Sequence, residues 1–261
     1  PFIIRTSLGH EIAHCWWGNG VTVDYSQGNW SEGLTTYLSD YLFKERQSPA
    51  GALEYRRQIL RNYTALVEAE SEFALAKFSS RSSPLTKAIG YDKSAMVFHM
   101  LRRQIGEDAF WAGLRDIFRQ RLFRKTGWAD LQAAFEQRAG RSLAAFFDQW
   151  VARKGAPRLR LSNIEINRTG PTGSRVIIGS IQQDEDIYVF PVTIRVHTAA
   201  GFQDHPIQIQ KRQTDFKVPA DDTPRWIELD PQIDHLRRLE LAEIPPTVNS
   251  LKCGKRVSVV V

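Results

Sequence analysis

Hydrophobic side chains recur every three or four positions from Phe2 to about Lys154, which is the spacing of one face of an α-helix. Gly106 and Gly140 stand where helix C-terminal caps belong, so they separate consecutive helices. The pattern therefore predicts a mainly helical first part of the chain. Its helices are expected over residues 31–47, 49–70, 91–106, 107–123, 128–140 and 142–154.

Beyond Gly155 the period of the pattern changes to two residues, as in half-buried β-strands. In residues 188–198 apolar side chains alternate with polar ones, and Gly, Pro and Asp separate this run from its neighbours. Shorter runs of the same kind occupy residues 159–161, 175–181, 205–210, 214–219 and 225–230. The pattern predicts a small antiparallel β-sandwich of about six or seven short strands.

Together the two patterns predict an α+β fold in three parts. These are a helical domain in residues 1–155, a β-sandwich in 156–240, and a linker with the start of a further domain in 241–261. The chain begins with Pro1 inside an apolar helical pattern and ends with the β-branched run Val257–Val261, so we expect it to continue at both ends in a longer protein. No run of about eighteen apolar residues occurs, so no transmembrane segment is expected.

Composition narrows the range of partners. The 261 residues include 35 Lys and Arg against 29 Asp and Glu, and this formal net charge of +6 is too mild to indicate nucleic acid. The richest basic run, Arg115–Lys125, carries apolar residues at helical spacing, so its arginines are expected on a solvated face. Two distant cysteines, Cys15 and Cys253, exclude a disulfide framework. Compartment and oligomeric state are not predicted.

The stretch GHEIAHCWWGNG, Gly9–Gly20, contains two histidines four positions apart. On a helix such residues lie about 40° apart around the axis, so His10 and His14 can bind one metal ion through their imidazole nitrogens. Glu11 borders the open coordination position, where its carboxylate can act as a general base toward water. The alternative is a partly exposed helix that happens to carry two histidines. Cys15 points about 100° away from this face and is expected to be a small buried thiol.

A third ligand is available in the next predicted helix. Gly18 and Gly20 end the first helix, and a loop to Asn29 leads into a helix that carries Glu32 in its first turn. Catalytic zinc sites use three protein ligands and leave one position open. However, Asn29 and Glu32 also fit a capping box, in which Glu32 would reach back to the helix start. The local pattern leaves both interpretations open.

The quoted stretch, followed by VT and by NWSEGLTTYLSDY, resembles the membrane alanyl aminopeptidase and leukotriene hydrolase family of gluzincins. In that family HExxH is followed by a Trp and a Gly-Asn pair, and then by a Glu-Gly about nineteen positions after the second histidine. The step from His14 to Glu32 is eighteen, and a deletion in the loop around residues 25–28 would account for it. The resemblance implies a thermolysin-like zinc-peptidase domain in which His10, His14 and Glu32 bind one Zn²⁺ and Glu11 activates water.

The resemblance extends to IGYDKSAMVFHML and FFDQWVARKGAPRLRL. The family has a tyrosine that stabilises the oxyanion, in a Tyr-x-Lys-Gly segment some sixty residues beyond the glutamate. Tyr91 stands fifty-nine positions after Glu32, and Ser94 replaces the usual Gly. Judged locally, Tyr91 could instead be a core tyrosine with its hydroxyl at the surface. The acidic residue often found seven positions after the glutamate is Ser39 here, with Asp40 beside it, so the residues that support the ligands stay unassigned.

The resemblance implies an aminopeptidase that removes N-terminal residues from peptides. The family binds the substrate's amino end partly through a Gly-x-Met-x-Asn segment, which this chain lacks, so the exopeptidase activity is implied by the family alone. Two alternatives are an endopeptidase of thermolysin type and a non-catalytic scaffold or interaction domain. The presence of Glu11 and Tyr91 favours an enzyme, because a structural zinc ion needs no general base.

Overall fold

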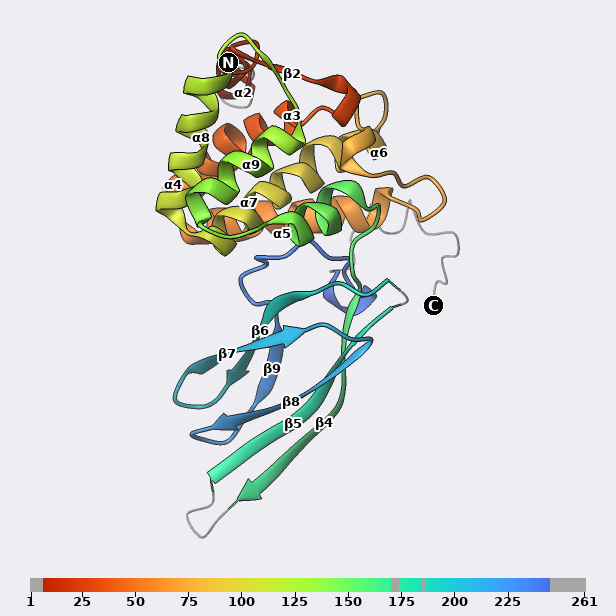
Figure 1. Cartoon of the computed structure of the whole chain (residues 1–261). Coiled ribbons are helices and arrows are strands. Elements are labelled where there is room, and N and C mark those ends of the chain that lie inside the picture. The colour runs from red at the N-terminus through yellow and green to blue at the C-terminus, as the bar shows by residue number, and fades with distance from the viewer. Residues whose placement is uncertain (1–6, 170–173, 185, 245–261) are drawn as a thin grey trace. The chain divides into compact units, whose positions relative to one another are not determined.

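The computed structural model describes residues 7–169, 174–184 and 186–244, which form two compact units (Figure 1). The first unit runs to Gly155 and resumes at Arg238, and the second covers Ala156–Arg237. Helices make up most of the first unit and antiparallel strands make up the second. The predicted combination of helices with antiparallel sheets is therefore confirmed. Most of the predicted linker and further domain, residues 245–261, lies outside the described residues.

The first unit is a set of packed helices joined by short turns (Figure 1). Ser48 caps the longest helix by accepting a hydrogen bond from the backbone N–H of Gly51 at 3.0 Å. The predicted helix over 91–106 begins earlier, because Ser83 and Thr86 form a capping box in front of it. The helices are α2 (Leu8–His14), α3 (Ser31–Thr35), α4 (Leu42–Gln47), α5 (Pro49–Leu66), α6 (Pro84–Lys87), α7 (Ser94–Ile105), α8 (Glu107–Arg121), α9 (Trp128–Ala139) and α10 (Ala144–Phe147).

Among the described residues, three segments adopt the wider π-helical turn, whose hydrogen bonds span one residue more than those of an α-helix. They are η2 (Thr36–Tyr41), η4 (Ala88–Lys93) and η5 (Asp148–Ala152). The segment η2 joins α3 to α4, and η4 joins α6 to α7 without a break. Each π-turn therefore rotates the residues that follow it relative to a regular α-helix. No π-turn was predicted from the hydrophobic pattern.

A buried tryptophan fixes the start of α3. Trp30 is fully buried, and its indole N–H donates a hydrogen bond to the backbone oxygen of Thr126 at 2.7 Å. Thr126 belongs to a small parallel ladder made of β1 (Trp17–Gly18), β2 (Val21–Val23) and β3 (Lys125–Thr126). This ladder was not predicted, since its strands are only two or three residues long. It holds the chain between α2 and α3 in place.

The second unit contains six described strands in two antiparallel sheets. In β6 the residues at alternate positions are buried, from Phe190 to Val196, as the sequence pattern predicts. One sheet has the order β4-β5-β8 and the other β7-β6-β9. Their bounds are β4 (Leu159–Thr169), β5 (Ser174–Gln183), β6 (Phe190–His197), β7 (Phe202–Ile209), β8 (Gln213–Ala220) and β9 (Trp226–Leu229).

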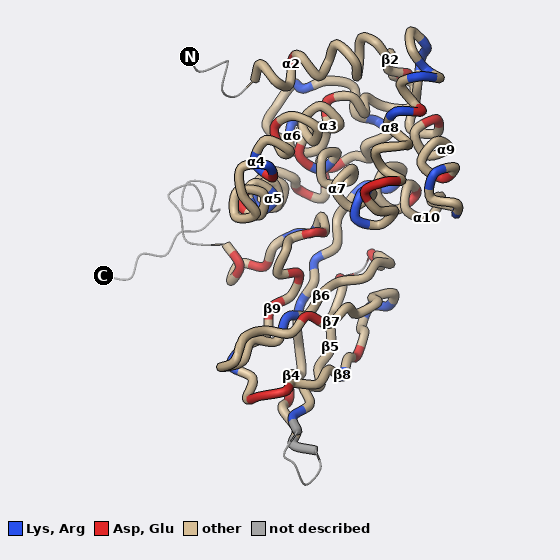
Figure 2. Tube along the Cα trace, turned by 90° about the vertical axis from the view of Figure 1, so that its left-hand side faces the viewer, with Lys and Arg blue, Asp and Glu red and all other residues tan. Residues whose placement is uncertain are grey.

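Basic and acidic residues are interspersed along the chain in both units (Figure 2). On α8, Arg115 and Arg119 are exposed while Ile117 is buried, so the expected solvated face is confirmed. Across the part of the chain that the structure describes, no helix combines the length and the hydropathy that a membrane span requires.

Candidate metal centre

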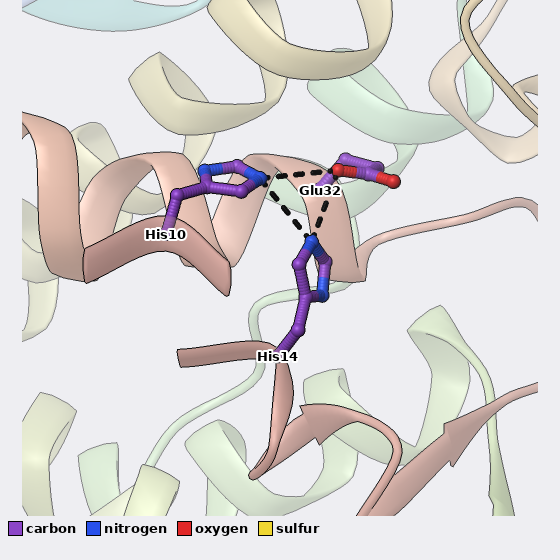
Figure 3. A group of neighbouring side chains, drawn as sticks. All are labelled: His10, His14 and Glu32. Carbon is purple, nitrogen blue, oxygen red and sulfur yellow. Dashed lines mark hydrogen bonds and ion pairs between the residues drawn. The ribbon is translucent and has the colours of Figure 1, made fainter. Parts of the chain in front are cut away.

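The two histidines of α2 and the glutamate of α3 converge on one point (Figure 3). His10 Nε2 lies 3.2 Å from His14 Nε2. Glu32 Oε2 lies 3.3 Å from the first of these nitrogens and 3.2 Å from the second. The three side chains are 11%, 17% and 21% exposed, so the point where they meet is partly shielded from water. The spacing of four residues on α2 therefore places both imidazoles on one face, as predicted.

Two features of the intervening loop aim Glu32 at the histidines. Gly18 has a φ of +113°, and a Cβ there would lie 3.2 Å from His14 Nδ1, so this position favours glycine. The side-chain oxygen of Asn29 accepts hydrogen bonds from Ser31, at 3.0 Å from the backbone N–H and 2.7 Å from the hydroxyl. Asn29 thus bonds Ser31, and Glu32 bonds the histidines. The capping-box interpretation of Glu32 is therefore wrong. The shortened loop still allows Glu32 to reach His10 and His14.

The triangle of donor atoms has the dimensions of a zinc site. With zinc–ligand distances of about 2.0–2.1 Å, neighbouring ligand atoms of a tetrahedron are about 3.3 Å apart. The three separations between His10, His14 and Glu32 are 3.2, 3.2 and 3.3 Å. Two imidazoles and one carboxylate are also a donor set that suits zinc. The residues therefore fit a single Zn²⁺ ion with one coordination position left open.

Hydrogen bonds on the far side of each imidazole fix which nitrogen carries the proton. His14 Nδ1 donates to the backbone oxygen of Trp17 at 2.9 Å, since a carbonyl oxygen can only accept. His10 Nδ1 faces the carboxylate of Asp40 at 3.3 Å. In their neutral forms both rings therefore turn an Nε2 lone pair toward the Glu32 carboxylate. Three acceptors that face one another need a cation between them, either a metal ion or protons.

The contacts between these residues shift the pKa values of Glu32, His10 and His14. Burial opposes the charged form of Glu32, but hydrogen bonds from His10 and His14 outweigh it and lower the pKa of Glu32 to about 2. Burial would lower the pKa of His10, yet its hydrogen bonds to Asp40 and Glu32 raise that pKa to about 9. The hydrogen bond to Glu32 likewise raises the pKa of His14. The site therefore has a strong preference for positive charge.

Asp40 is a site residue that the sequence left unassigned. It is the eighth residue after Glu32, whereas a regular α-helix would bring the seventh to this face. The π-turn η2 begins at Thr36 and adds one residue to the helix between them. This extra residue places Asp40 beside His10, while the hydroxyl of Ser39 bonds the backbone oxygen of Thr35 at 2.7 Å. Asp40 therefore supports His10 from a position that the regular helical repeat does not predict.

Glu11 and Tyr91 line the same cavity, which has a volume of about 580 Å³. Glu11 is exposed on α2, directly after His10. Tyr91 comes from the π-turn η4, and its ring stacks on that of His10 with 6.0 Å between centroids. Burial, followed by the charge of Glu32 and a hydrogen bond to it, raises the pKa of Tyr91, so its hydroxyl keeps its proton. Tyr91 is therefore a cavity residue and not a core tyrosine.

Cys15 is exposed, so its prediction as a buried thiol is wrong. It is the C-cap residue of α2, where the chain leaves the helix. Within the described ranges, it does not belong to the group of potential ligands that His10, His14 and Glu32 form.

Comparisons with known proteins identify the family of the chain. The family model described as peptidase family M1 domain matches residues 4–150. Aminopeptidase 2 of Candida albicans is 24% identical over 219 residues, which are 82% of this chain and 24% of that protein. Aminopeptidase N of Lactococcus lactis subsp. lactis is 26% identical over 158 residues, which are 58% of this chain and 18% of that protein. This chain therefore spans a quarter or less of these two relatives.

A solved structure shares the fold. The crystal structure of Legionella pneumophila aminopeptidase A in complex with aspartic acid superposes with a TM-score of 0.59 at 18% sequence identity. The match covers 88% of this chain and 26% of that one.

Proposed function

Since this chain belongs to peptidase family M1, we propose that it is the catalytic part of a zinc-dependent aminopeptidase that removes N-terminal residues from peptides. The helical residues 1–155 would be its thermolysin-like catalytic domain, and 156–240 its β-sandwich. The observation that carries the proposal is the triangle of His10, His14 and Glu32, with separations close to the edge of a zinc tetrahedron. These three residues would hold one Zn²⁺, which would polarise the substrate carbonyl and make water more acidic.

Glu11 would move the protons. Its carboxylate is exposed to the cavity and stands next to a ligand on α2, so it can accept a proton from the water that attacks the carbonyl carbon. The same carboxyl group can then give this proton to the nitrogen of the leaving amine. No other residue is needed for this transfer, because acceptance and donation occur in sequence.

Tyr91 would stabilise the negative charge that develops on the carbonyl oxygen. Its raised pKa keeps the phenol protonated, and its hydroxyl lies close enough to bond Glu32 at the site. A hydrogen-bond donor placed in advance at a developing oxyanion contributes roughly 3–4 kcal/mol to a transition state. Tyr91 would therefore act at the chemical step more than in substrate binding.

Replacing Glu11 by glutamine tests the proposal. Glu11→Gln should retain one zinc per chain and lose at least about a thousandfold in kcat, because the amide cannot accept the proton. Glu70→Gln is a matched control, since Glu70 is exposed and does not line the cavity. Full hydrolysis by Glu11→Gln would refute the mechanism. A peptide and its N-acetylated form separate the two classes of peptidase: an aminopeptidase cleaves only the free amine, whereas an endopeptidase cleaves both.

A further inference from the structure

Two cationic side chains line the cavity of the candidate metal centre, and the mechanism above does not use them. Arg81 and Lys87 line it together with Tyr91. Arg81 lies just before α6 and Lys87 is the last residue of that helix. Three acidic residues line the cavity as well, and two of them, Glu32 and Asp40, bond the histidines. The lining of the cavity therefore contains both acidic and cationic side chains.

The charge of Lys87 is already balanced within the protein. Its ammonium lies 3.2 Å from a carboxylate oxygen of Asp92, which is buried and also accepts a hydrogen bond from Asn62 at 3.2 Å. Burial raises the pKa of Asp92, and the charge of Lys87 acts against this shift. Removing Lys87 would leave a buried carboxyl without its cation, so the role of this lysine is at least partly structural.

Arg81 differs from Lys87 in its charge pairing. Its side chain is exposed, and no carboxylate of the described residues pairs with it. Its positive charge lowers the pKa of Tyr91, against the larger effect of burial, so the guanidinium acts electrostatically on the hydroxyl at the metal centre. A planar guanidinium presents several N–H donors in a fork that matches a carboxylate. Arg81 is thus a guanidinium that lines the cavity and forms no ion pair among the described residues, although its charge also acts to lower the pKa of the buried Asp92.

We propose that Arg81 binds a carboxylate of the substrate, so that this enzyme prefers peptides with a negative charge close to the scissile bond. The proposal rests on the proposed peptidase function. The bound Zn²⁺ would offset the charges of Glu32 and Asp40 at the centre, and Lys87 is paired with Asp92. Among the described lining residues, Arg81 is therefore the cationic side chain that can pair with a substrate carboxylate. The carboxylate belongs either to an acidic N-terminal side chain or to the C-terminus of a short peptide.

Binding without turnover tests the proposal. The zinc-loaded protein with Glu11→Gln is titrated calorimetrically with two pairs of peptides. The first pair is Ala-Ala-Ala and its C-terminal amide, and the second is Glu-Ala-Ala-amide and Gln-Ala-Ala-amide. The charged member of one pair should bind roughly five- to tenfold more tightly than its neutral partner. A preference within the first pair identifies the terminal carboxylate, and one within the second identifies the acidic side chain.

The added substitution Arg81→Gln should abolish this preference, whereas Arg46→Gln should retain it. Arg46 is an exposed arginine of α4 that does not line the cavity, so it controls for the loss of one positive charge. Equal affinities within both pairs, or an unchanged preference in Arg81→Gln, would overturn the proposal. Hydrolysis of Ala-Ala-Ala-amide by the unsubstituted protein tests the peptidase function separately, because that peptide carries no carboxylate.

Discussion

Asp40 should control the affinity of the metal centre although it does not belong to the triangle of ligands. Its carboxylate faces His10 Nδ1 at 3.3 Å and thereby directs the Nε2 lone pair of the ring toward His14 and Glu32. Asp40→Ala removes both the acceptor and its negative charge. The imidazole is then free to rotate or to change tautomer, so part of the binding free energy must be used to restore its orientation.

The magnitude follows from the geometry and exposure of the pair. Loss of a hydrogen-bond partner of a metal-binding histidine typically weakens metal binding by 10–100-fold, or roughly 1.4–2.7 kcal/mol. The Asp40 side chain is 27% exposed and its contact is long, so water screens part of the interaction. We therefore expect about a tenfold loss for Asp40→Ala. Asp40→Asn keeps an acceptor and loses only the charge, so its effect should be smaller, about threefold.

The dissociation constant for zinc can be measured by competition with a chromophoric chelator at neutral pH. Circular dichroism of the metal-free proteins verifies that each variant is folded. Asp108→Ala serves as a control, because Asp108 is exposed on α8 and does not line the cavity. If Asp40→Ala binds zinc as tightly as the unsubstituted protein, Asp40 does not orient His10, and the significance assigned to the π-turn is wrong.

Three further predictions concern Tyr91 and the helix that carries it. Tyr91→Phe should retain zinc and reduce kcat roughly 100–1,000-fold with little change in KM, and an unchanged kcat would exclude an oxyanion contact. Gly33→Ala should reduce the free energy of unfolding by about 1–3 kcal/mol, because its new Cβ would overlap Ser94. Ser94→Ala should raise the free energy of unfolding by about 1 kcal/mol, since the Ser94 hydroxyl is buried without a partner among the described residues. Urea denaturation of both variants checks these opposite signs. Burial lowers the pKa of Lys93 from 10.5 to about 8, so the unfolded chain binds this proton more strongly than the folded one between those values. Stability should therefore rise across that pH window by at most about 3 kcal/mol, and Lys93→Met should flatten the rise in urea titrations repeated at each pH.

The sequence predicted the elements that depend on local spacing. His10 and His14 share a face because four residues nearly complete one helical turn, whatever the rest of the chain does. The alternation in β6 and the caps at Gly106 and Gly140 are local in the same sense. Ser83 and Thr86 also cap locally, but the predicted helix began at Tyr91 because the hydrophobic pattern is clearest from there. Short strands such as those of the ladder around Val21–Val23 carry too few residues to show a period.

The remaining features depend on contacts between segments far apart in the chain. On local sequence Glu32 fits a helix cap better than a third ligand. Its actual contacts depend on the loop that carries it to α2, which Trp30 and the strand at Thr126 hold in place. Arg81 and Lys87 look alike as basic residues. The partner of Lys87, Asp92, is only five residues further on, but the burial of that carboxylate depends on the packing of η4. The sequence by itself determined the spacing of the HExxH pattern and the two structural periods, because both are set within a few residues. The tertiary structure alone decided that Asp40 supports His10, because a single π-turn changes the direction of every side chain after it.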